Sequence, residues 1–402
     1  MKIKSNTDSP DNVFIEGIHY ETGKPVRIEI REGVIANISD STDQEIRGRN
    51  LFIAPGLIDN QVNGYRGVDF SDITLVPDQM KKATEHILKD GVTSFLPTII
   101  TNSHENLLRN FRNLYKALED EQINDTVPGF HLEGPYISPE EGFYGCHPLS
   151  FIRKPSWNEF IEYQKAAGGK IVQVTLCPEA DGAIEFIKKS VQNRVLVAIG
   201  HTNASNEQIN KAVEAGARLS THLGNGCANL IDRHRNPFWP QLANDLLIPS
   251  IIADGHHLLP EEIKVFYKVK GADNIILTSD VNFLIGMPPG NYVYLGGDIV
   301  YTEDGLVKNP ALNCLAGASM PLRKGVETMA KYTGCSLGEA VNMATKNVAR
   351  IYNLTDRGVL APGKRADIIL FELNKYQLNI KKTFLKGNLV YSDMHLTLGP
   401  EP

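Results

Sequence analysis

One stretch, residues 195–225, limits the folds open to this chain more than any other. An apolar run, Val195–Ile199, ends just before His201, and a second short apolar run ends just before His222. The segment between the two runs has a helical pattern. Strand, helix and strand in this order are typical of a parallel sheet, in which neighbouring strands point the same way. The two imidazoles are therefore expected at the same end of adjacent strands, facing one space.

The boundaries of the helix between the two runs are marked in the sequence. Ser205, with Gln208 three residues later, forms the pattern of a capping box, and Gly216 is a typical helix stop. A single histidine at a strand end is most often a structural, hydrogen-bonded residue. Two histidines in register across one unit make a metal site an equal alternative, and the rest of the chain has to decide between these interpretations.

Composition restricts the class of protein. The chain has 402 residues, a net charge of −6 and 42% hydrophobic residues, which is ordinary for a globular protein with a sizeable core. The negative charge argues against nucleic acid or an anionic membrane as main partner. Five cysteines without a CxxC pair indicate reduced thiols. No secretory signal is visible, and no apolar run approaches the ~20 residues needed to span a bilayer. We expect a cytoplasmic protein.

Both ends of the chain are rich in short strands separated by turns. Such runs occur between residues 12 and 52 and again after Gly358, with a turn at Lys386-Gly387. We expect residues 1–53 and 354–402 to form one small β-sandwich domain. Residues 54–353 then form the catalytic domain.

The middle of the chain alternates apolar runs with helical patterns. Eight strands are expected in the segments LFIAPGLIDNQVN, GVTSFLPTII, GFHLEG, KIVQVTLCP, RVLVAIGH, ARLSTH, PSIIADG and NIILTSD. Eight strands over ~300 residues fit an α/β fold of the (β/α)8 TIM-barrel type better than a doubly wound sheet. No glycine-rich phosphate loop is present. In such a barrel the catalytic residues lie at the carboxyl ends of the strands.

Several of the expected strands are followed by polar side chains that carry chemistry: Gln61, Asn63, Glu133, His201, His222, His257 and Asp280. One carboxylate and two imidazoles suit Zn²⁺ with an open position for water. A further carboxylate beside that water is the expected general base. Taken singly, Glu133 is equally explained as an acid at a helix N-terminus and Asp280 as a cap.

The order of short motifs along the chain resembles a known family. They are APGLIDNQVNG, GVTSFLPT, HLEGP, GHTNAS, THLGN, IADGHH, TSD, LAGAS and GVLAPGKRADIILF, which together span nearly the whole sequence. The chain resembles the amidohydrolase superfamily and, within it, the N-acetylglucosamine-6-phosphate deacetylase family. The resemblance implies a metal-dependent barrel that removes the acetyl group from an N-acetyl amino sugar phosphate in amino-sugar catabolism.

The resemblance also implies roles for individual residues. Glu133, His201 and His222 match the metal ligands, Asp280 the catalytic aspartate, and His147 the histidine that polarises the substrate carbonyl. The family motif around that histidine is Gly-x-His-Asn-Pro, whereas here Pro148 follows His147 directly. The His-x-His pair that often binds a second metal reads Gln61-Val-Asn63, and neutral amides are poor ligands. We expect one divalent ion, Zn²⁺ before Fe²⁺, Co²⁺ or Mn²⁺.

The sequence indicates the residues that bind the substrate less clearly than those that carry out the reaction. They are expected at Asn225, Gly226, His257, Gln61 and Asn63, with either Arg233 or Arg235 as the phosphate ligand, which by resemblance reaches across a homodimer interface. The family reads Asn-Ala-Met where this chain has Asn225-Gly226-Cys227. The following segment, DRHRNPFWPQLAND, is richer in basic and aromatic residues, and also suits a carboxylate or an unphosphorylated sugar with Trp239 on its ring.

The expected reaction is hydrolysis of an acetamide, with Asp280 taking a proton from the water and returning it to the leaving amine. Two alternatives remain open. One is an amidohydrolase that acts on a non-phosphorylated N-acyl sugar or another N-acyl compound. The other is a metal-free, amidohydrolase-like scaffold.

Overall fold

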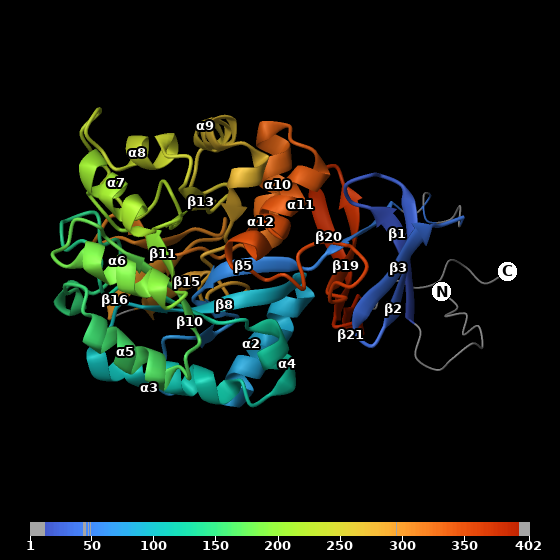
Figure 1. The fold of residues 1–402 in the computed structure, drawn as a ribbon, viewed down its shortest axis with the longest axis horizontal. Coiled ribbons are helices and arrows are strands. Elements are labelled where there is room, and N and C mark those ends of the chain that lie inside the picture. The colour runs from blue at the N-terminus through green and yellow to red at the C-terminus, as the bar shows by residue number, and fades with distance from the viewer. Residues whose placement is uncertain (1–12, 43–45, 47, 49, 295, 394–402) are drawn as a thin grey trace.

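An eight-stranded barrel and a second sheet beside it make up the structure, a computed structural model that describes residues 13–42, 46, 48, 50–294 and 296–393. Figure 1 shows the barrel surrounded by helices, with the second sheet at one end of the molecule.

The second sheet is built from both ends of the described chain. Its strand order is β21-β20-β19-β4-β1-β2-β3. The strands are β1 (Val13–His19), β2 (Pro25–Arg31), β3 (Val34–Asp40), β4 (Leu51–Pro55), β19 (Ile368–Asn374), β20 (Gln377–Leu385) and β21 (Asn388–Ser392). β4 joins the two ends, because it pairs parallel with β1 and antiparallel with β19. Apolar side chains from both halves, such as Ile28 and Ile368, share one core cluster. The expected union of the chain ends is thus confirmed, while the domain boundaries at residues 53 and 354 stay predictions.

The barrel consists of eight parallel strands, seven of them within a predicted segment, while β13 begins one residue before its predicted segment. They are β5 (Leu57–Val62), β8 (Val92–Ile100), β9 (Phe130–Glu133), β10 (Ile171–Leu176), β11 (Leu196–Ile199), β12 (Leu219–Ser220), β13 (Ile248–Ile251) and β14 (Ile276–Leu277). A parallel bridge between Val62 and Val281 connects the first strand to the chain just after the last. The predicted (β/α)8 fold is confirmed.

Helices connect the strands and cover the outside of the barrel. They are α2 (Pro77–Lys89), α3 (His104–Ala117), α4 (Glu121–Thr126), α5 (Trp157–Ala166), α6 (Ala183–Gln192), α7 (Asn206–Ala215), α8 (Phe238–Ala243), α9 (Pro260–Lys270), α10 (Leu322–Thr333), α11 (Leu337–Met343) and α12 (Lys346–Ile351). The predicted capping box of α7 is present. Ser205 Oγ accepts the Gln208 amide at 3.3 Å, and Gln208 Oε1 accepts the Ser205 amide at 2.8 Å.

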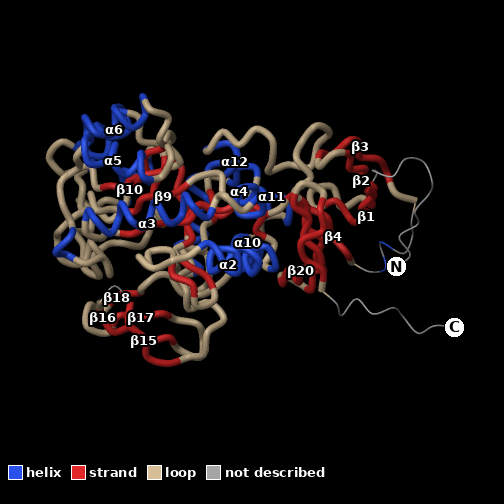
Figure 2. The backbone as a smooth tube through the Cα atoms, turned by 90° about the horizontal axis from the view of Figure 1, so that it is seen from below, coloured by secondary structure: helices blue, strands red, loops and turns tan. Residues whose placement is uncertain are grey.

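Two small antiparallel sheets lie beyond the barrel strands. One is the hairpin of β6 (Gly64–Tyr65) and β7 (Val68–Asp69); the other contains β15 (Gly290–Tyr294), β16 (Gly297–Tyr301), β17 (Val307–Asn309) and β18 (Cys314–Leu315). Figure 2 shows the four-stranded sheet projecting from one side of the barrel. It has no counterpart among the expectations from sequence, because strands this short show little alternation of apolar and polar residues.

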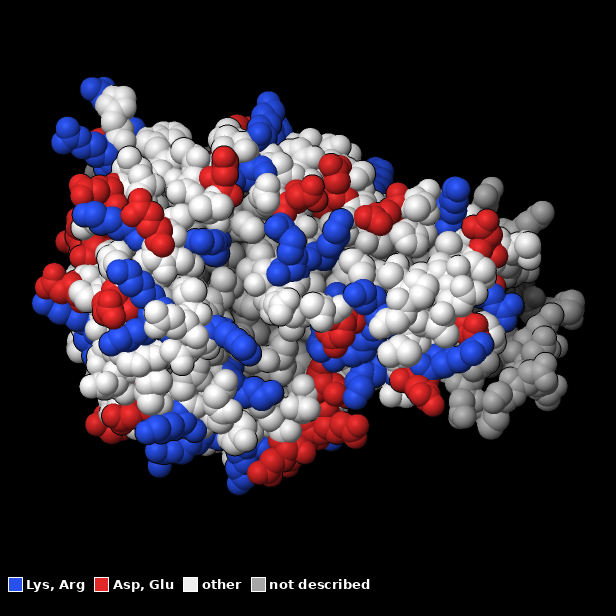
Figure 3. Space-filling view, viewed as in Figure 1, with Lys and Arg blue, Asp and Glu red and all other residues white. Residues whose placement is uncertain are grey.

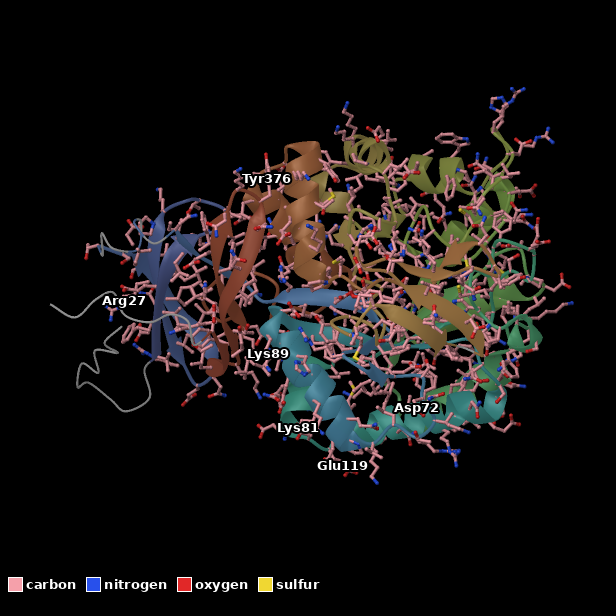
Figure 4. All side chains as sticks on the ribbon, turned by 180° about the vertical axis from the view of Figure 1, so that it is seen from behind. Arg27, Asp72, Lys81, Lys89, Glu119 and Tyr376 are labelled. Atoms are coloured by element: carbon pink, nitrogen blue, oxygen red, sulfur yellow. The ribbon has the colours of Figure 1, made fainter. Side chains whose placement is uncertain are left out.

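The surface carries charges of both signs. Acidic and basic side chains are interspersed over the face in Figure 3, without a broad field of one sign. On the opposite side, Lys81 and Lys89 extend outward from α2 (Figure 4). Among the described residues, no helix combines the length and apolar character needed to cross a membrane.

The contact between the second sheet and the barrel includes a buried ion pair, which yields a prediction. Asp367 pairs with Arg365, with side-chain exposures of 3% and 10%, and Arg365 also donates to the carbonyl of Asp125 at 2.9 Å. We expect Asp367→Ala to lower the free energy of unfolding by about 3 kcal/mol, because it leaves a buried guanidinium without its counter-charge. Urea denaturation followed by circular dichroism measures the change.

The matched control is Asp181→Ala, which breaks the exposed Lys154–Asp181 pair. Solvent screens that pair, so the denaturation midpoint should not move. Equal midpoints for the two variants would contradict the role given to Asp367.

Candidate functional site

Parallel pairing brings the two histidines of residues 195–225 side by side. β11 and β12 are adjacent and in a register that pairs Ile199 with Ser220. His201 and His222 each follow two residues later, so they lie opposite each other at the carboxyl end of the barrel. Glu133 is the last residue of β9, on the same side of the sheet.

These three side chains meet inside the protein. Glu133 Oε1 lies 2.9 Å from His222 Nε2 and 3.4 Å from His201 Nε2, and all three residues are at most 6% exposed. Burial raises the pKa of Glu133, but hydrogen bonds and charge from the two imidazoles outweigh it and hold that pKa well below its usual value.

The hydrogen bonds of the imidazoles indicate what the cluster can hold. His201 Nδ1 lies 2.9 Å from the main-chain carbonyl of Phe143, which can only accept, so Nδ1 carries the hydrogen. In the neutral ring, Nε2 then presents a lone pair toward the carboxylate of Glu133. His222 Nδ1 is buried with no hydrogen-bond partner in the described chain. Burial lowers the pKa of His222, but the carboxylate of Glu133 outweighs it and raises that pKa, and a hydrogen can lie between these two groups. With both rings deprotonated, two imidazole nitrogens and a carboxylate oxygen directed at one place are the ligand chemistry of a divalent cation.

His147 lies beside this cluster. Its ring is 4.6 Å from that of His201, and Nδ1 is 2.8 Å from Thr101 Oγ1. Nitrogen or oxygen atoms of Glu133, His147 and His201 all lie within 4.8 Å of one another. Burial, with a smaller effect of His201, lowers the pKa of His147 to about 3. The ring is therefore neutral, with Nε2 free of the threonine.

Asp280 lines the same cavity and is held by two amides. Gln61 Nε2 donates to Asp280 Oδ1 at 2.8 Å, and Asn63 Nδ2 donates to the same oxygen at 2.7 Å. Burial and the negative charge of Glu133 raise the pKa of Asp280. Because both amides donate to Oδ1, the second carboxylate oxygen, Oδ2, can accept or donate a proton in the cavity.

The backbone at these strand ends is strained. His201, His222 and Asp280 have φ values of 49°, 30° and 50°, in the left-handed region that residues other than glycine seldom adopt. Each such residue costs about 1–3 kcal/mol and usually marks a functional site. Three of them follow three barrel strands, at the point where their side chains turn into the cavity.

The cavity enclosed by these residues has a volume of about 290 Å³. Besides Glu133, His147, His201, His222 and Asp280, its walls include Asn63, Asn225, Gly226, His257, Tyr294 and the segment from Cys314 to Gly317. His257 is oriented by Asp254, whose Oδ2 accepts from Nδ1 at 2.7 Å. Gly226 packs on His201, and a Cβ there would lie 2.9 Å from the ring.

Not every residue predicted for the site lies in this cavity. Gln61 lies behind Asp280 rather than on the cavity wall. Arg233 and Arg235 are exposed on the segment between β12 and α8, away from the cavity lining. This segment is the yellow-green loop projecting at the upper left of Figure 1, and Figure 3 shows basic side chains at its tip. The described residues that line the cavity include no lysine or arginine.

Other contributors to the site have little signal in the sequence. Thr101, the carbonyl of Phe143, Tyr294 and residues 314–317 reach it from loops and from the four-stranded sheet. The role of Asp254 could have been predicted from the sequence, because a carboxylate three residues before His257 is placed to orient that ring.

Comparisons with known proteins agree with this geometry. Residues 52–390 match the model of the Amidohydrolase family. The chain is 31% identical to the N-acetylglucosamine-6-phosphate deacetylase of Lysinibacillus sphaericus, over 85% of this chain and 88% of that protein. It is 29% identical to an N-acetylgalactosamine-6-phosphate deacetylase of Escherichia coli O157:H7, over 90% and 94%.

Solved structures show the same similarity. The N-acetylglucosamine-6-phosphate deacetylase of Thermotoga maritima superposes with a TM-score of 0.84 at 27% identity, covering 95% of this chain and all of that one. A variant of the Mycobacterium smegmatis deacetylase, in complex with N-acetyl-D-glucosamine 6-phosphate, gives 0.85 at 25% identity with the same coverage. The chain therefore belongs to the amidohydrolase family and, within it, to the N-acetylglucosamine-6-phosphate deacetylases, hydrolases of amide bonds.

Proposed function

We propose that this protein hydrolyses the acetamide of N-acetylglucosamine 6-phosphate, releasing acetate and glucosamine 6-phosphate. The observation that carries the proposal is the meeting of Glu133, His201 and His222 lone pairs within reach of a cavity that also contains Asp280. The donor set argues against the metal-free scaffold, because such a cluster of acceptors is unfavourable without a cation or proton between them.

Glu133, His201 and His222 would hold one divalent ion, with Zn²⁺ favoured by the nitrogen and oxygen ligands over Fe²⁺, Co²⁺ or Mn²⁺. When bound, such an ion supplies the Lewis acidity that activates water and polarises the amide carbonyl. The amides of Gln61 and Asn63 are engaged with Asp280, which supports a single ion rather than a pair.

Asp280 is the proton carrier of the proposed reaction. With Oδ1 held by Gln61 and Asn63, Oδ2 accepts the proton of the attacking water and then delivers it to the departing amine nitrogen. The raised pKa of Asp280 suits both steps, because a carboxyl that is too acidic returns a proton poorly. The two amides thus act mainly by orienting this carboxylate.

His147 is proposed to stabilise the negative charge that develops on the acetyl oxygen. If the hydroxyl of Thr101 donates to Nδ1, then Nε2 carries the hydrogen and donates into the cavity. A neutral imidazole, favoured by its low pKa, donates without repelling the nearby cation.

The 6-phosphate requires a cation that the described cavity wall does not supply. Asn225, Gly226 and His257 line the cavity, whereas the two arginines expected to bind the phosphate, Arg233 and Arg235, are exposed to solvent. Neither guanidinium forms an ion pair or side-chain hydrogen bond with the described chain. Leu230, earlier on the same segment, is 92% exposed. These features support a homodimer in which the largely exposed residues 230–235 of one subunit reach the cavity of the other.

The five free cysteines and the phosphorylated substrate support a cytoplasmic location. Because one relative is an N-acetylgalactosamine-6-phosphate deacetylase, the specificity for the sugar epimer is tested below.

The base assignment gives a first prediction for activity. Asp280→Asn should retain the bound ion, because Asp280 is not among its three proposed ligands, while kcat falls by about 10²–10⁴-fold for want of a proton acceptor. Acetate release and elemental analysis of the same preparation measure both. Near-normal turnover with the ion in place would refute the assignment.

A second prediction concerns the support of His201. We expect Gly226→Ala to weaken metal affinity about tenfold or more, because the added Cβ displaces the ring of His201. Competition with a chelator measures the affinity. Gly169→Ala is the control, since Gly169 shares the positive φ but a Cβ there meets nothing within 4 Å. An equal loss in both variants would point to backbone strain alone.

A third prediction tests the substrate and its phosphate. Acetate release is screened over N-acetylglucosamine, N-acetylgalactosamine and N-acetylmannosamine, each with and without 6-phosphate. We expect N-acetylglucosamine 6-phosphate to give the highest kcat/KM. Removal of the phosphate-binding arginine, by Arg233→Ala or Arg235→Ala, should raise KM about 10–100-fold for the phosphorylated sugar alone.

Mass determination in solution completes this test, and a dimer is expected. Activity confined to unphosphorylated sugars would overturn the roles of Arg233, Arg235 and His257. It would favour the alternative of a non-phosphorylated N-acyl substrate.

A further inference from the structure

Two cysteines lie against each other in the wall of the catalytic cavity. The sulfur atoms of Cys146 and Cys314 are 3.0 Å apart, and both residues line the cavity. Cys146 lies on the loop that follows β9 and immediately precedes His147, whereas Cys314 begins β18 of the projecting sheet. The pair therefore spans two walls of the cavity that are 168 residues apart in the chain.

The geometry of this pair is close to that of a covalent bond. A disulfide bond is about 2.0 Å long, so the two sulfur atoms have to approach by only about 1 Å. Cys146 also lies 3.4 Å from the carbonyl of Leu315, which holds it against β18. In the reduced protein the contact is a thiol hydrogen bond.

The two thiols are also accessible to a small oxidant. Both are partly exposed, while Cys177 is buried in the core and Cys335 lies at the distant start of α11. The hydrogen bond from Cys146 lowers the pKa of Cys314, which favours the thiolate at that sulfur. Cys227 lines the cavity as well, but its sulfur is directed at the carbonyl of Gly224.

We propose that Cys146 and Cys314 form a reversible disulfide that closes the catalytic cavity under oxidising conditions. With a peroxide as oxidant, the thiolate of Cys314 attacks one peroxide oxygen, and the other oxygen leaves with a proton. The resulting sulfenic acid is attacked by the sulfur of Cys146, so that the S–S bond forms and water is released. The two thiols lose two protons and two electrons in total, and hydrogen peroxide is reduced to two waters. A dithiol reductant reverses the change.

The bond acts on the residues next to Cys146. His147 directly follows Cys146, and Gly145 directly precedes Cys146. A Cβ added at Gly145 would lie 3.2 Å from the ring of His201. Drawing Cys146 toward β18 therefore displaces His147 and fixes the loop against the wall formed by residues 314–317. A displacement near 1 Å of a catalytic group reduces turnover strongly.

The test uses the full-length, metal-loaded protein and one to a few equivalents of hydrogen peroxide. We expect a cross-linked Cys146–Cys314 peptide in mass spectrometry and a loss of two hydrogen atoms in the intact mass. Acetate release from N-acetylglucosamine 6-phosphate should fall at least about tenfold, with unchanged metal content, and recover on addition of dithiothreitol.

Three variants separate this disulfide from other oxidation. With the activity of each reduced variant taken as its own baseline, Cys314→Ser and Cys146→Ser should be insensitive to peroxide, whereas Cys335→Ser should stay sensitive. Absence of the cross-linked peptide overturns the proposal, as does equal inactivation of Cys314→Ser. The peptide readout needs no enzymatic activity, so it stands even if the proposed deacetylation fails.

Discussion

Acceptor atoms from three barrel strands meet at one point of this protein, and the site depends on that meeting. Glu133 Oε1 lies within 3.4 Å of an imidazole nitrogen from each of two neighbouring strands, all in the buried interior. Acceptor atoms this close together in the interior are unfavourable unless a cation or a proton lies between them. The hydrogen bond from His201 to the carbonyl of Phe143 fixes which nitrogen faces inward. The cluster thus selects for a cation through its lone pairs.

The barrel supplies the rigidity that such a cluster requires. Its parallel pairing places successive strand ends at one rim, and the bridge between Val62 and Val281 closes the circle beside Asp280. That closure brings Gln61 and Asn63 onto Asp280 from the first strand. The left-handed backbone at His201, His222 and Asp280 is tolerated because the surrounding core leaves those residues no alternative.

The walls of the cavity have a different origin from its floor. The floor comes from strand ends, whereas the walls come from the loop after β9, the loop after β12 and the small sheet β15–β18. These elements carry the exposed arginines, Gly226 against His201, and the pair Cys146–Cys314. Chemistry and substrate recognition are therefore built on separate parts of the fold, which allows one to vary without the other.

The sequence by itself determined the eight barrel strands, the union of the chain ends, the capping of α7, and the set Glu133, His201, His222 and Asp280 at strand ends. It could do so because hydrophobic runs and caps are local signals, and because parallel strands bring their carboxyl ends together by rule. Only the tertiary structure decided that Gln61 and Asn63 hold Asp280, that Asp254 orients His257, and that Arg233 and Arg235 point away from their own cavity. It also brought Cys146 to Cys314. Those relations join residues far apart in the chain, or depend on the direction of a loop, and a local pattern contains neither kind of information.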